Sequence, residues 1–497
     1  MSPQFHVPQN VEEADPRRWV GFFFLLLASF MNLIDVTVVN VALPSMQANL
    51  KATPSDIEWV VAGYVLAFAL GLLPFGRLGD IVGRKRMFLL GVAGFTLGSL
   101  LCGLAPTMGL LIAARVLQGL AASAMTPQVL SIAQVTFPPA ERGLMFSLFG
   151  LAASLASVAG PLIGGALIAG DFWGLDWRPI FLVNVPFGML AIVGAALTVT
   201  RVPPHPGLKN DPFGILLFGL AVVLLVYPLI EGHGFGWPLW IFGMMALSVV
   251  LMAVFYFWQH RRAASGAPQL LPANLLHNRN FLVGILITTL FSSGIPGSFV
   301  VLAIFLQTGF GFTPLMSGLT TVPFSIGVVV TSLASGRLGS RFLSARVALG
   351  ALLLAVGWGS LGMVLGGVGG SLDHWVLLVP LALGGLGLGI TFGALFQTIL
   401  AGVPPRDAGA GSGALQAFQQ IGGALGVALI GEIFFTWLEH AQPAGAAARP
   451  AAFTAAISHA TIYDVAVFAA VILLVPLLKP LPRGEGQPDA PPVVVEV

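Results

Sequence analysis

The sequence is poor in charged residues. Only 8% of its 497 residues are Asp, Glu, Lys or Arg, whereas 57% are hydrophobic. A soluble domain carries about 25% charged residues, and a soluble chain of this length could not cover its surface with so few. The formal net charge is only +2, which gives no indication of a nucleic-acid partner. The composition therefore predicts that a lipid bilayer surrounds most of the chain.

Cysteine and metal-binding patterns are equally scarce. The single cysteine, Cys102, lies in an apolar run, so it cannot form an internal disulfide and is expected to be a small buried hydrophobe. The eight histidines show no metal-ligand spacing. No lysine follows a glycine, which excludes the phosphate-binding loop of an ATP-driven pump. No nucleophile–base or metal constellation indicates an enzyme, and no cofactor is expected.

Long apolar runs are what the sequence does have. A membrane-spanning helix needs about 20 mostly apolar residues. Fourteen runs meet this requirement: 18–43, 57–76, 86–106, 108–134, 143–169, 178–200, 213–231, 238–258, 280–307, 314–336, 345–367, 374–401, 409–436 and 460–478. The first run follows two arginines, as a signal peptide would, but it is too long, lacks a cleavage site and contains Asn32, Asp35 and Asn40. We therefore predict a retained first helix.

The distribution of positive charge tests this helix count independently. With a cytoplasmic N-terminus, 18 of the 22 Lys and Arg residues fall in inner segments and three in outer segments, while Arg115 lies within a helix. The positive-inside rule predicts such a bias for an even number of helices, with both termini in the cytoplasm. One helix more or fewer would reverse every later connection and blur the bias.

The fourteen runs group as six, two and six. We predict the following parts: a cytoplasmic tail at 1–17, a six-helix bundle at 18–200, a linker at 201–279 with two extra helices (213–231 and 238–258), a second six-helix bundle at 280–478, and a disordered cytoplasmic tail at 479–497. A short repeat relates the bundles, because GRLGD at 76–80 and GRLGS at 336–340 each follow the second helix of a bundle. Two related halves are typical of a transporter that rocks around a central site.

The connection after the second run carries the most specific pattern, GRLGDIVGRKR at 76–86. Its glycines permit close approach and unusual backbone angles, and its basic residues hold it inside, which alone could account for the stretch. The stretch resembles the loop 2–3 signature of the major facilitator superfamily at Gly76, Leu78, Asp80, Gly83, Arg84 and Lys85. It departs from that signature at Ile81, where a basic residue is common. The resemblance implies that this loop locks one conformation through contacts between the two halves, and the departure puts one such contact in doubt.

Three further segments agree with this family. The stretch LIDVTVVNVALP at 33–44 resembles the helix 1 signature of the fourteen-helix drug:proton antiporter branch. Residues 111–115, with Gln118 and Gly119, resemble the helix 4 arginine motif tied to proton coupling. In helix 5, an antiporter motif that seals against leak is matched by Gly160, Pro161, Gly164 and Gly165, with Ala156 where a leading glycine is usual. Helix packing alone could also explain these glycines.

The resemblance implies a fold and a function. We expect the all-α major facilitator fold, with two six-helix bundles and two extra transmembrane helices between them. The expected protein is a monomeric multidrug efflux antiporter of a bacterial inner membrane, whose partners are protons and small lipophilic or cationic substrates. It would be driven by the proton gradient and confer antibiotic resistance.

Asp35 and Arg115 are the first candidates for proton coupling. Asp35 lies about 24 Å from the inner end of its helix, and Arg115 lies about 10 Å from the outer end of its own. In a hydrocarbon core of about 30 Å these depths overlap, so the two side chains could be neighbours. Burial favours the protonated form of Asp35, whereas a nearby arginine favours the carboxylate. The alternative is a static pair that only holds helices together.

Other polar residues within the runs are weaker candidates. Glu231 and Glu432 lie near outer helix ends, as does Asp464, where an interfacial carboxylate costs little. Amide and aromatic side chains could line a substrate pocket, although each could equally form an ordinary bond between helices: Asn32, Asn40, Tyr64, Gln118, Gln128, Asn184, Gln397, Gln416 and Gln419.

Two other classes of function are compatible with the sequence. A channel would need a ring of charges or carbonyls, usually from several subunits, and the paired halves and buried Asp35 argue against it. A symporter, or a proton-coupled carrier for one metabolite or lipid, would share the same fold, and only the resemblance in helices 1 and 5 favours antiport.

Overall fold

The computed structural model describes residues 14–170, 174–201, 204, 207–232, 234–368, 371–441 and 449–479. All regular elements in these residues are helical. Within this part of the chain, thirteen helices are long and apolar enough to cross a membrane. The remaining predicted run, 143–169, is helical as well, within the 31-residue helix α5 (Pro139–Ala169). The predicted all-α membrane fold is therefore confirmed.

The first group of helices follows the predicted runs closely. Besides α5 it consists of α1 (Arg18–Leu50), α2 (Pro54–Val82), α3 (Arg84–Gly103), α4 (Met108–Thr136), α6 (Pro179–Leu182) and α7 (Asn184–Thr198). Local signals set some of their starts, since Thr53 forms a capping box with Asp56 at α2 and the Thr107 side chain caps α4. In this group α4 packs against α2 and α3, and α1 packs against α5 and α7.

Two extra helices follow the first group. They are α8 (Pro212–Glu231) and α9 (Leu239–Ala264), and the short α10 (Ala273–His277) comes after them. The buried Asp211 carboxylate caps α8 by accepting the Gly214 N–H, and it also accepts hydrogen bonds from Trp258 and Gln259 of α9. Helix α8 also contacts α2 and α17. This pair of helices is thus tied together at one end and packed against the rest of the molecule.

The second group is more interrupted. Its elements are α11 (Arg279–Ser293), α12 (Pro296–Ile304), the π-helical turn η2 (Phe305–Gly309), α13 (Pro314–Thr320), α14 (Val322–Arg337), α15 (Leu343–Gly366), η3 (His374–Leu377), α16 (Leu378–Leu400), η4 (Pro405–Asp407), α17 (Ala408–His440), α18 (Arg449–Leu474) and η5 (Val475–Leu477). The predicted run 280–307 is broken at Gly294 and Ile295, directly before Pro296, which cannot donate a backbone hydrogen bond.

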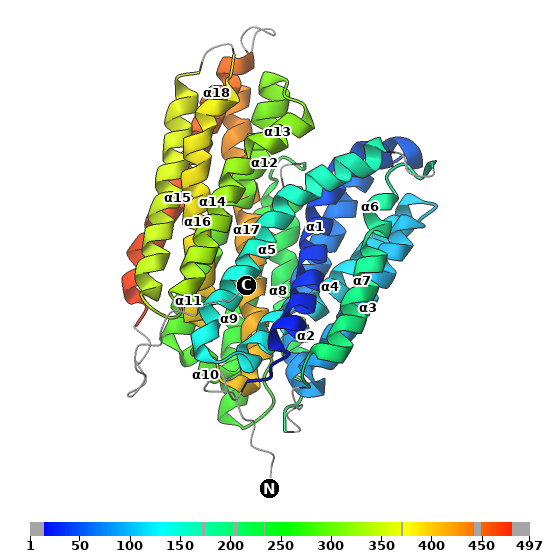
Figure 1. Ribbon diagram of the computed structural model, residues 1–497, viewed down its shortest axis with the longest axis vertical. Helices are drawn as coiled ribbons and strands as arrows, with labels where there is room; N and C mark the ends of the chain where they lie inside the picture. Colours follow the sequence, from blue (N-terminus) through cyan, green and yellow to red (C-terminus); the bar gives the residue numbers. More distant parts are fainter. Residues whose placement is uncertain are drawn as a thin grey trace.

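The two groups lie side by side, close together at one end and spread apart toward the other (Figure 1). The close end is formed by the connections after α2, α14 and α16; it carries Arg84, Lys85, Arg341, Arg346 and Arg406, and we call it the basic end. Across the groups, α2 and α4 contact α17, and α5 contacts α14 and α16. The basic end therefore holds the main contacts between groups.

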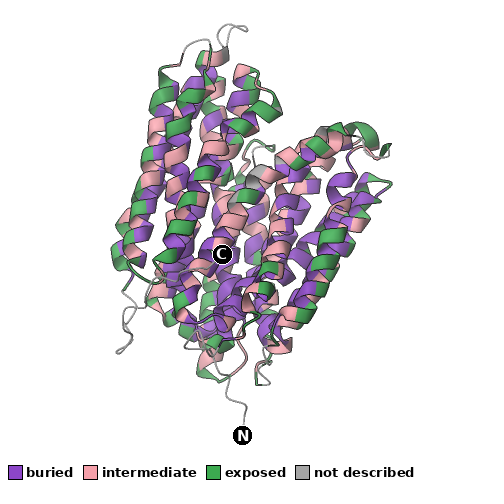
Figure 2. Ribbon diagram, in the orientation of Figure 1, coloured by how far each residue is buried: buried purple, intermediate pink, exposed green. Residues whose placement is uncertain are grey.

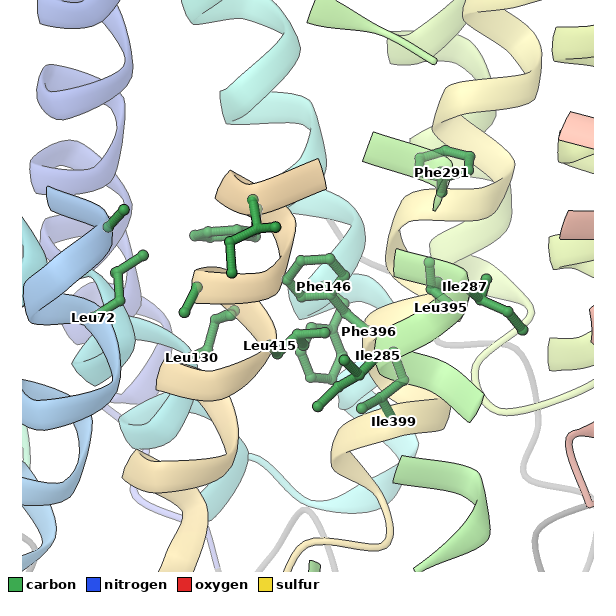
Figure 3. Packing of buried hydrophobic residues seen from close by; sticks show 14 of the residues in the cluster. Leu72, Leu130, Phe146, Ile285, Ile287, Phe291, Leu395, Phe396, Ile399 and Leu415 are labelled. Atoms are coloured by element: carbon green, nitrogen blue, oxygen red, sulfur yellow. The ribbon is translucent and has the colours of Figure 1, made fainter. Parts of the chain in front are cut away.

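Buried apolar side chains fill the space between helices, and exposed ones cover the outside. Figure 3 shows Phe146, Phe396, Leu415 and Ile285, from four different helices, packed together near the junction of the two groups. Outward faces of the helices are exposed along their length (Figure 2), and they carry large apolar residues such as Leu197, Val249, Phe257, Met363 and Leu473. Such an outer surface suits lipid rather than water.

Three predicted boundaries were wrong, and the first is the end of α1, which continues to Leu50 rather than to 43. Helix α2 continues to Val82, so residues 76–82 belong to its last turns and only Gly83, at φ 102°, breaks the chain before α3. Helix α18 begins at Arg449 rather than at 460, because its alanine-rich first turns form good helix despite their modest hydropathy. The predicted tails 1–17 and 479–497 lie almost wholly outside the described residues.

Candidate functional site

Asp35 and Arg115 form an ion pair in the interior of the first group. The Arg115 Nη1 atom lies 2.5 Å from Asp35 Oδ2, and the two side chains are 1% and 0% exposed. Asp35 is in α1 and Arg115 in α4, so the shared depth inferred from their positions in the sequence corresponds to direct contact. A charge in this position is expensive to bury alone, and each side chain provides the other with its counter-ion.

Amide side chains complete the surroundings of the carboxylate. Asp35 Oδ1 accepts hydrogen bonds from Gln118 Nε2 at 2.9 Å and from Asn184 Nδ2 at 3.0 Å. Gln118 and Asn184 also both donate to the Ser99 hydroxyl, at 2.8 Å and 3.4 Å. The network therefore joins α1, α3, α4 and α7 around one carboxylate, which accepts three hydrogen bonds in this conformation.

Arg115 has partners besides Asp35. Its Nε donates to the Val60 carbonyl of α2 at 3.0 Å, and its Nη1 donates to Gln118 Oε1 at 2.7 Å. The guanidinium lies over the Tyr64 ring, 4.2 Å from its centroid, and the Tyr64 hydroxyl donates to Asn32 of α1. Of the predicted pocket residues, the structure thus brings Asn32, Tyr64, Gln118 and Asn184 to this one network.

A second constellation joins the two groups at the basic end. Asp80, in the last turns of α2, accepts from Arg84 Nε at 3.0 Å and Nη2 at 2.8 Å. The same carboxylate accepts the backbone N–H groups of Gly409 and Ala410 at 3.0 Å each, in the first turn of α17. A carboxylate at a helix N-terminus is favoured by the unpaired N–H groups and the helix dipole. Asp80 therefore caps a helix of the opposite group.

Further bonds extend this contact. Arg77 Nη1 lies 2.9 Å from Asp407 Oδ1, with both side chains buried, and Arg84 donates to the Pro405 carbonyl. Gln134 of α4 donates to the Leu400 carbonyl at 2.5 Å. We call these side chains, with Asp80 and the glycines described next, the basic-end latch. Lys85 instead stays within the first group, where it donates to the carbonyls at the end of α7.

Glycine lets the two groups approach this closely. A Cβ atom on Gly76 would lie 2.4 Å from the Gly409 carbonyl oxygen, and one on Gly409 would lie 2.2 Å from the Gly76 carbonyl oxygen. These neighbours are backbone atoms, which cannot rotate away as a side chain could. The close approach expected of Gly76 and the unusual backbone angle expected of Gly83 are both present, although the residues belong to helix ends rather than to a loop.

Helices α1 and α5 meet at the glycines of the helix 5 motif. A Cβ atom on Gly160 would lie 1.9 Å from Thr37 Oγ1, and one on Gly164 would lie 2.7 Å from a Val38 methyl carbon. In contrast, a Cβ atom on Gly165 would meet no described atom within 4 Å, so the structure does not bear out the close packing expected of this glycine. The fourth motif residue, Pro161, has a side chain outside the described part of the structure.

We expect Gly160→Ala to destabilise the α1–α5 interface, whereas Gly165→Ala, in the same helix, is expected to have little effect. Overpacking of this kind costs about 1–3 kcal/mol. Thermal unfolding of the two purified variants in the same detergent would measure the difference. Equal unfolding temperatures would show that Thr37 and α1 move aside without cost.

The other predicted pocket residues do not gather at the Asp35 network. Gln128 donates to the Phe75 carbonyl at 2.9 Å and holds α4 against α2. Gln397 and Gln416 are buried in the second group, each with one side-chain atom that lacks a hydrogen bond within the described residues. Gln419 is partly exposed and Asn40 is exposed. The structure therefore does not bring these five residues together in one site.

The three acidic side chains expected near outer helix ends differ in their surroundings. Glu231 is the last residue of α8 and is largely buried, and Glu432 accepts the Trp237 indole N–H at 2.7 Å. Asp464 was expected at the interface, and that expectation was wrong. It lies 15 residues into α18 and is 1% exposed, because the helix starts earlier than its hydropathy indicated.

Sequence reasoning missed Asp407 and Ser99. Asp407 lies directly before α17 and could have been found as an acid at a helix start on the same predicted side as the 76–86 stretch. Ser99 lies in an apolar run, and no pattern in the sequence distinguishes it from other small residues there.

Comparison with known proteins agrees with this architecture. The model of the Major Facilitator Superfamily matches residues 25–215 and 212–427. The probable actinorhodin transporter of Streptomyces coelicolor is 40% identical over 422 residues, 84% of this chain and 73% of that protein. The puromycin resistance protein pur8 of Streptomyces alboniger is 34% identical over 467 residues, 93% of this chain and 91% of that protein.

Two further similarities concern a multidrug resistance protein and a solved structure. The multidrug resistance protein Stp of Mycobacterium tuberculosis is 33% identical over 413 residues, 83% of this chain and 75% of that protein. The crystal structure of the human organic anion transporter MFSD10 matches 93% of this chain and 100% of its own, with a TM-score of 0.65 and 16% identity. At that identity the likeness shows the fold alone.

The fold and the buried charges define a class, that of multi-pass membrane transporters rather than enzymes. Within that class, the chain belongs to the Major Facilitator Superfamily.

Proposed function

We propose that this protein is a proton-coupled antiporter that exports small lipophilic or cationic compounds from a bacterial cell. The observation that carries the proposal is the buried Asp35–Arg115 pair, which ties four helices of one group to a single titratable carboxylate. The names of the relatives, which include antibiotic resistance and multidrug resistance proteins, support export of such compounds.

The charge distribution supports the proposed orientation in the membrane. The basic end faces the cytoplasm in this proposal, since 18 of the 22 Lys and Arg residues fall on that side, and both termini lie there. The membrane is the bacterial inner membrane, the unit is a monomer, and no cofactor takes part. The bundles 18–200 and 280–478 form the two moving halves, with 201–279 as the linker.

The proposed cycle uses the two constellations as linked switches. In the conformation described, the basic-end latch is closed and Asp35 is ion-paired. A proton on Asp35 neutralises the carboxylate and removes its attraction to Arg115, so that α1 and α4 are free to shift. Opening of the latch then exposes the site to the cytoplasm. Reformation of the ion pair releases the proton there, while substrate enters for the return step.

A cationic substrate has a direct way to compete with this proton. The same carboxylate that binds a proton also attracts a lipophilic cation, and aromatic rings such as that of Tyr64 stabilise cations nearby. Proton and substrate therefore bind alternately, which is the requirement for exchange rather than leak.

The test is transport by the purified protein in liposomes, with ethidium as the probe and a pH-sensitive dye on the opposite side. The proposal expects ethidium movement against its gradient when a pH gradient is imposed, opposite proton movement, and saturable counterflow. Proton flux without saturation, or no response of ethidium to the pH gradient, would contradict antiport of this substrate class.

A narrower substrate is the second candidate. The relative with 40% identity is named as a probable transporter of one compound, actinorhodin. The protein would then be a proton-coupled carrier for one metabolite or lipid, on the same fold and with the same Asp35 chemistry. A susceptibility panel of unrelated compounds separates the two, because protection against several classes requires a broad exporter.

A further inference from the structure

A buried carboxyl group in the second group of helices plays no part in the proposed cycle. Asp464 of α18 is 1% exposed, and its two carboxyl oxygens lie 2.8 and 2.9 Å from the Ser298 hydroxyl of α12. Within the described residues no Arg, Lys or His side chain pairs with it. This contrasts with Asp35, whose charge is compensated by Arg115.

The helices packed against α18 supply little charge. Helix α12 and the turns η2 and η5 contain no charged residue. The charged or titratable residues of the other neighbours lie mostly near helix ends: Arg279 in α11, Arg346 in α15, and Glu432, Glu439 and His440 in α17. In α18 itself, Tyr463 donates to Ser293 at 3.0 Å and His459 stacks on Trp437. An anion at Asp464 would therefore be uncompensated, whereas a neutral carboxyl group fits the site.

The site lies where a transmembrane segment is broken. Helix α11 ends at Ser293 and α12 begins at Pro296, so Ser298 is in the first turn of a half-helix within the span Arg279–Gly309. Broken helices inside membranes are tolerated where they line a site, and they often supply ion-binding groups. The break also provides a place where the Asp464–Ser298 contact can change as the protein moves.

The arrangement resembles that of the Asp35 network in the other group. There, Asn184 of α7, the last spanning segment of its group, contacts Asp35 in the first spanning segment. Here, Asp464 of α18, again the last, contacts Ser298 in the first. Each group thus has an acid where its first and last spanning segments meet. In the first group the acid is on the first segment, and in the second group it is on the last.

From this geometry we propose that Asp464 is a second proton-binding site, occupied in the conformation described and emptied when α12 shifts relative to α18. On release the O–H bond of the carboxyl group breaks and the proton passes to water, which solvates the carboxylate that remains once α12 has shifted. The proposal rests on the proposed antiport for its role in transport, but the bound proton itself can be tested separately.

Infrared difference spectroscopy of the purified protein in lipid is the direct test, because a protonated buried carboxyl group has a carbonyl band distinct from that of a carboxylate. We expect part of this band to disappear in Asp464→Asn and to remain in Asp35→Asn. Asp373→Asn, which removes an exposed acid outside both sites, is the matched control. A band unchanged in Asp464→Asn would overturn the proposal.

Two further measurements separate the possible failures. Ser298→Ala keeps the acid and removes its hydrogen-bond partner, so it should shift the band even if Asp464→Asn does not fold; an unshifted band would count against the site. In liposomes, Asp464→Asn should lower the number of protons exchanged per ethidium by one. If wild-type protein shows the band but no proton-coupled transport, the antiport proposal fails while the proton site stands.

Discussion

Replacement of Asp35 by Asn is expected to abolish accumulation driven by the pH gradient while the protein is still produced and inserted. A gradient of two pH units provides about 2.7 kcal/mol per proton, enough for one coupled proton to sustain about a hundredfold substrate gradient. Without a carboxylate at position 35, proton and ethidium no longer compete for one group. The expected ratio of ethidium concentrations across the membrane is therefore about one, although Asp464 still binds its own proton. Asparagine keeps an oxygen for Gln118 and Asn184, so much of the local packing should survive.

The controls decide between coupling and a static pair. Asp35→Glu keeps a carboxyl group and should retain dependence on the pH gradient, even if its rate is lower. If Asp35 only holds helices together, the Asn variant would be less stable but would still accumulate ethidium against its gradient. Accumulation in liposomes and thermal unfolding, measured on the same preparation, distinguish these outcomes.

Gly409→Ala is expected to open the basic-end latch. The added methyl group would lie 2.2 Å from the Gly76 carbonyl oxygen and 2.7 Å from Asp80 Oδ1, so the two groups must separate. An overpacking cost of about 1–3 kcal/mol shifts the equilibrium away from the closed latch by about 5- to 150-fold. A carrier held with this end open completes fewer transport cycles. The rate of export should therefore fall as the population with a closed latch falls.

The matched control is Gly431→Ala, a substitution in the same helix with no neighbour within 4 Å of the added atom. Spin labels at exposed positions of the two groups, for example Arg86→Cys and Ser340→Cys with Cys102 replaced by Ala, would report the separation of the basic end. We expect a longer distance in Gly409→Ala and the unchanged distance in Gly431→Ala. If the distance between the labels is the same in both variants, α17 accommodates the added methyl group while the latch stays closed.

Residues 76–86 show which structural features a local sequence pattern can predict and which it cannot. Their composition identified a tight connection and a contact between halves, because glycine and clustered charge have local physical consequences. The partner of Asp80 could not be read in the same way. It consists of backbone N–H groups of α17, which any residue type except proline could provide, and it lies about 330 positions away in the chain.

Asp35 and Asp464 also differ in how well the sequence predicted their surroundings. The depth of Asp35 followed from helix length and the rise per residue, so its neighbourhood with Arg115 could be anticipated. Asp464 was misplaced because the alanine-rich start of α18 is only weakly apolar, and its burial depends on helices α11, α12, α15 and α17 packing around it.

The sequence by itself determined the solvent, the helical segments, the family and the preferred side for positive charge, since each follows from composition and spacing summed along the chain. Only the tertiary structure decided which polar groups are partners, where glycine is needed for contact, and which acids lack a counter-ion. Those properties depend on distances between side chains on different helices, and a linear pattern does not contain them.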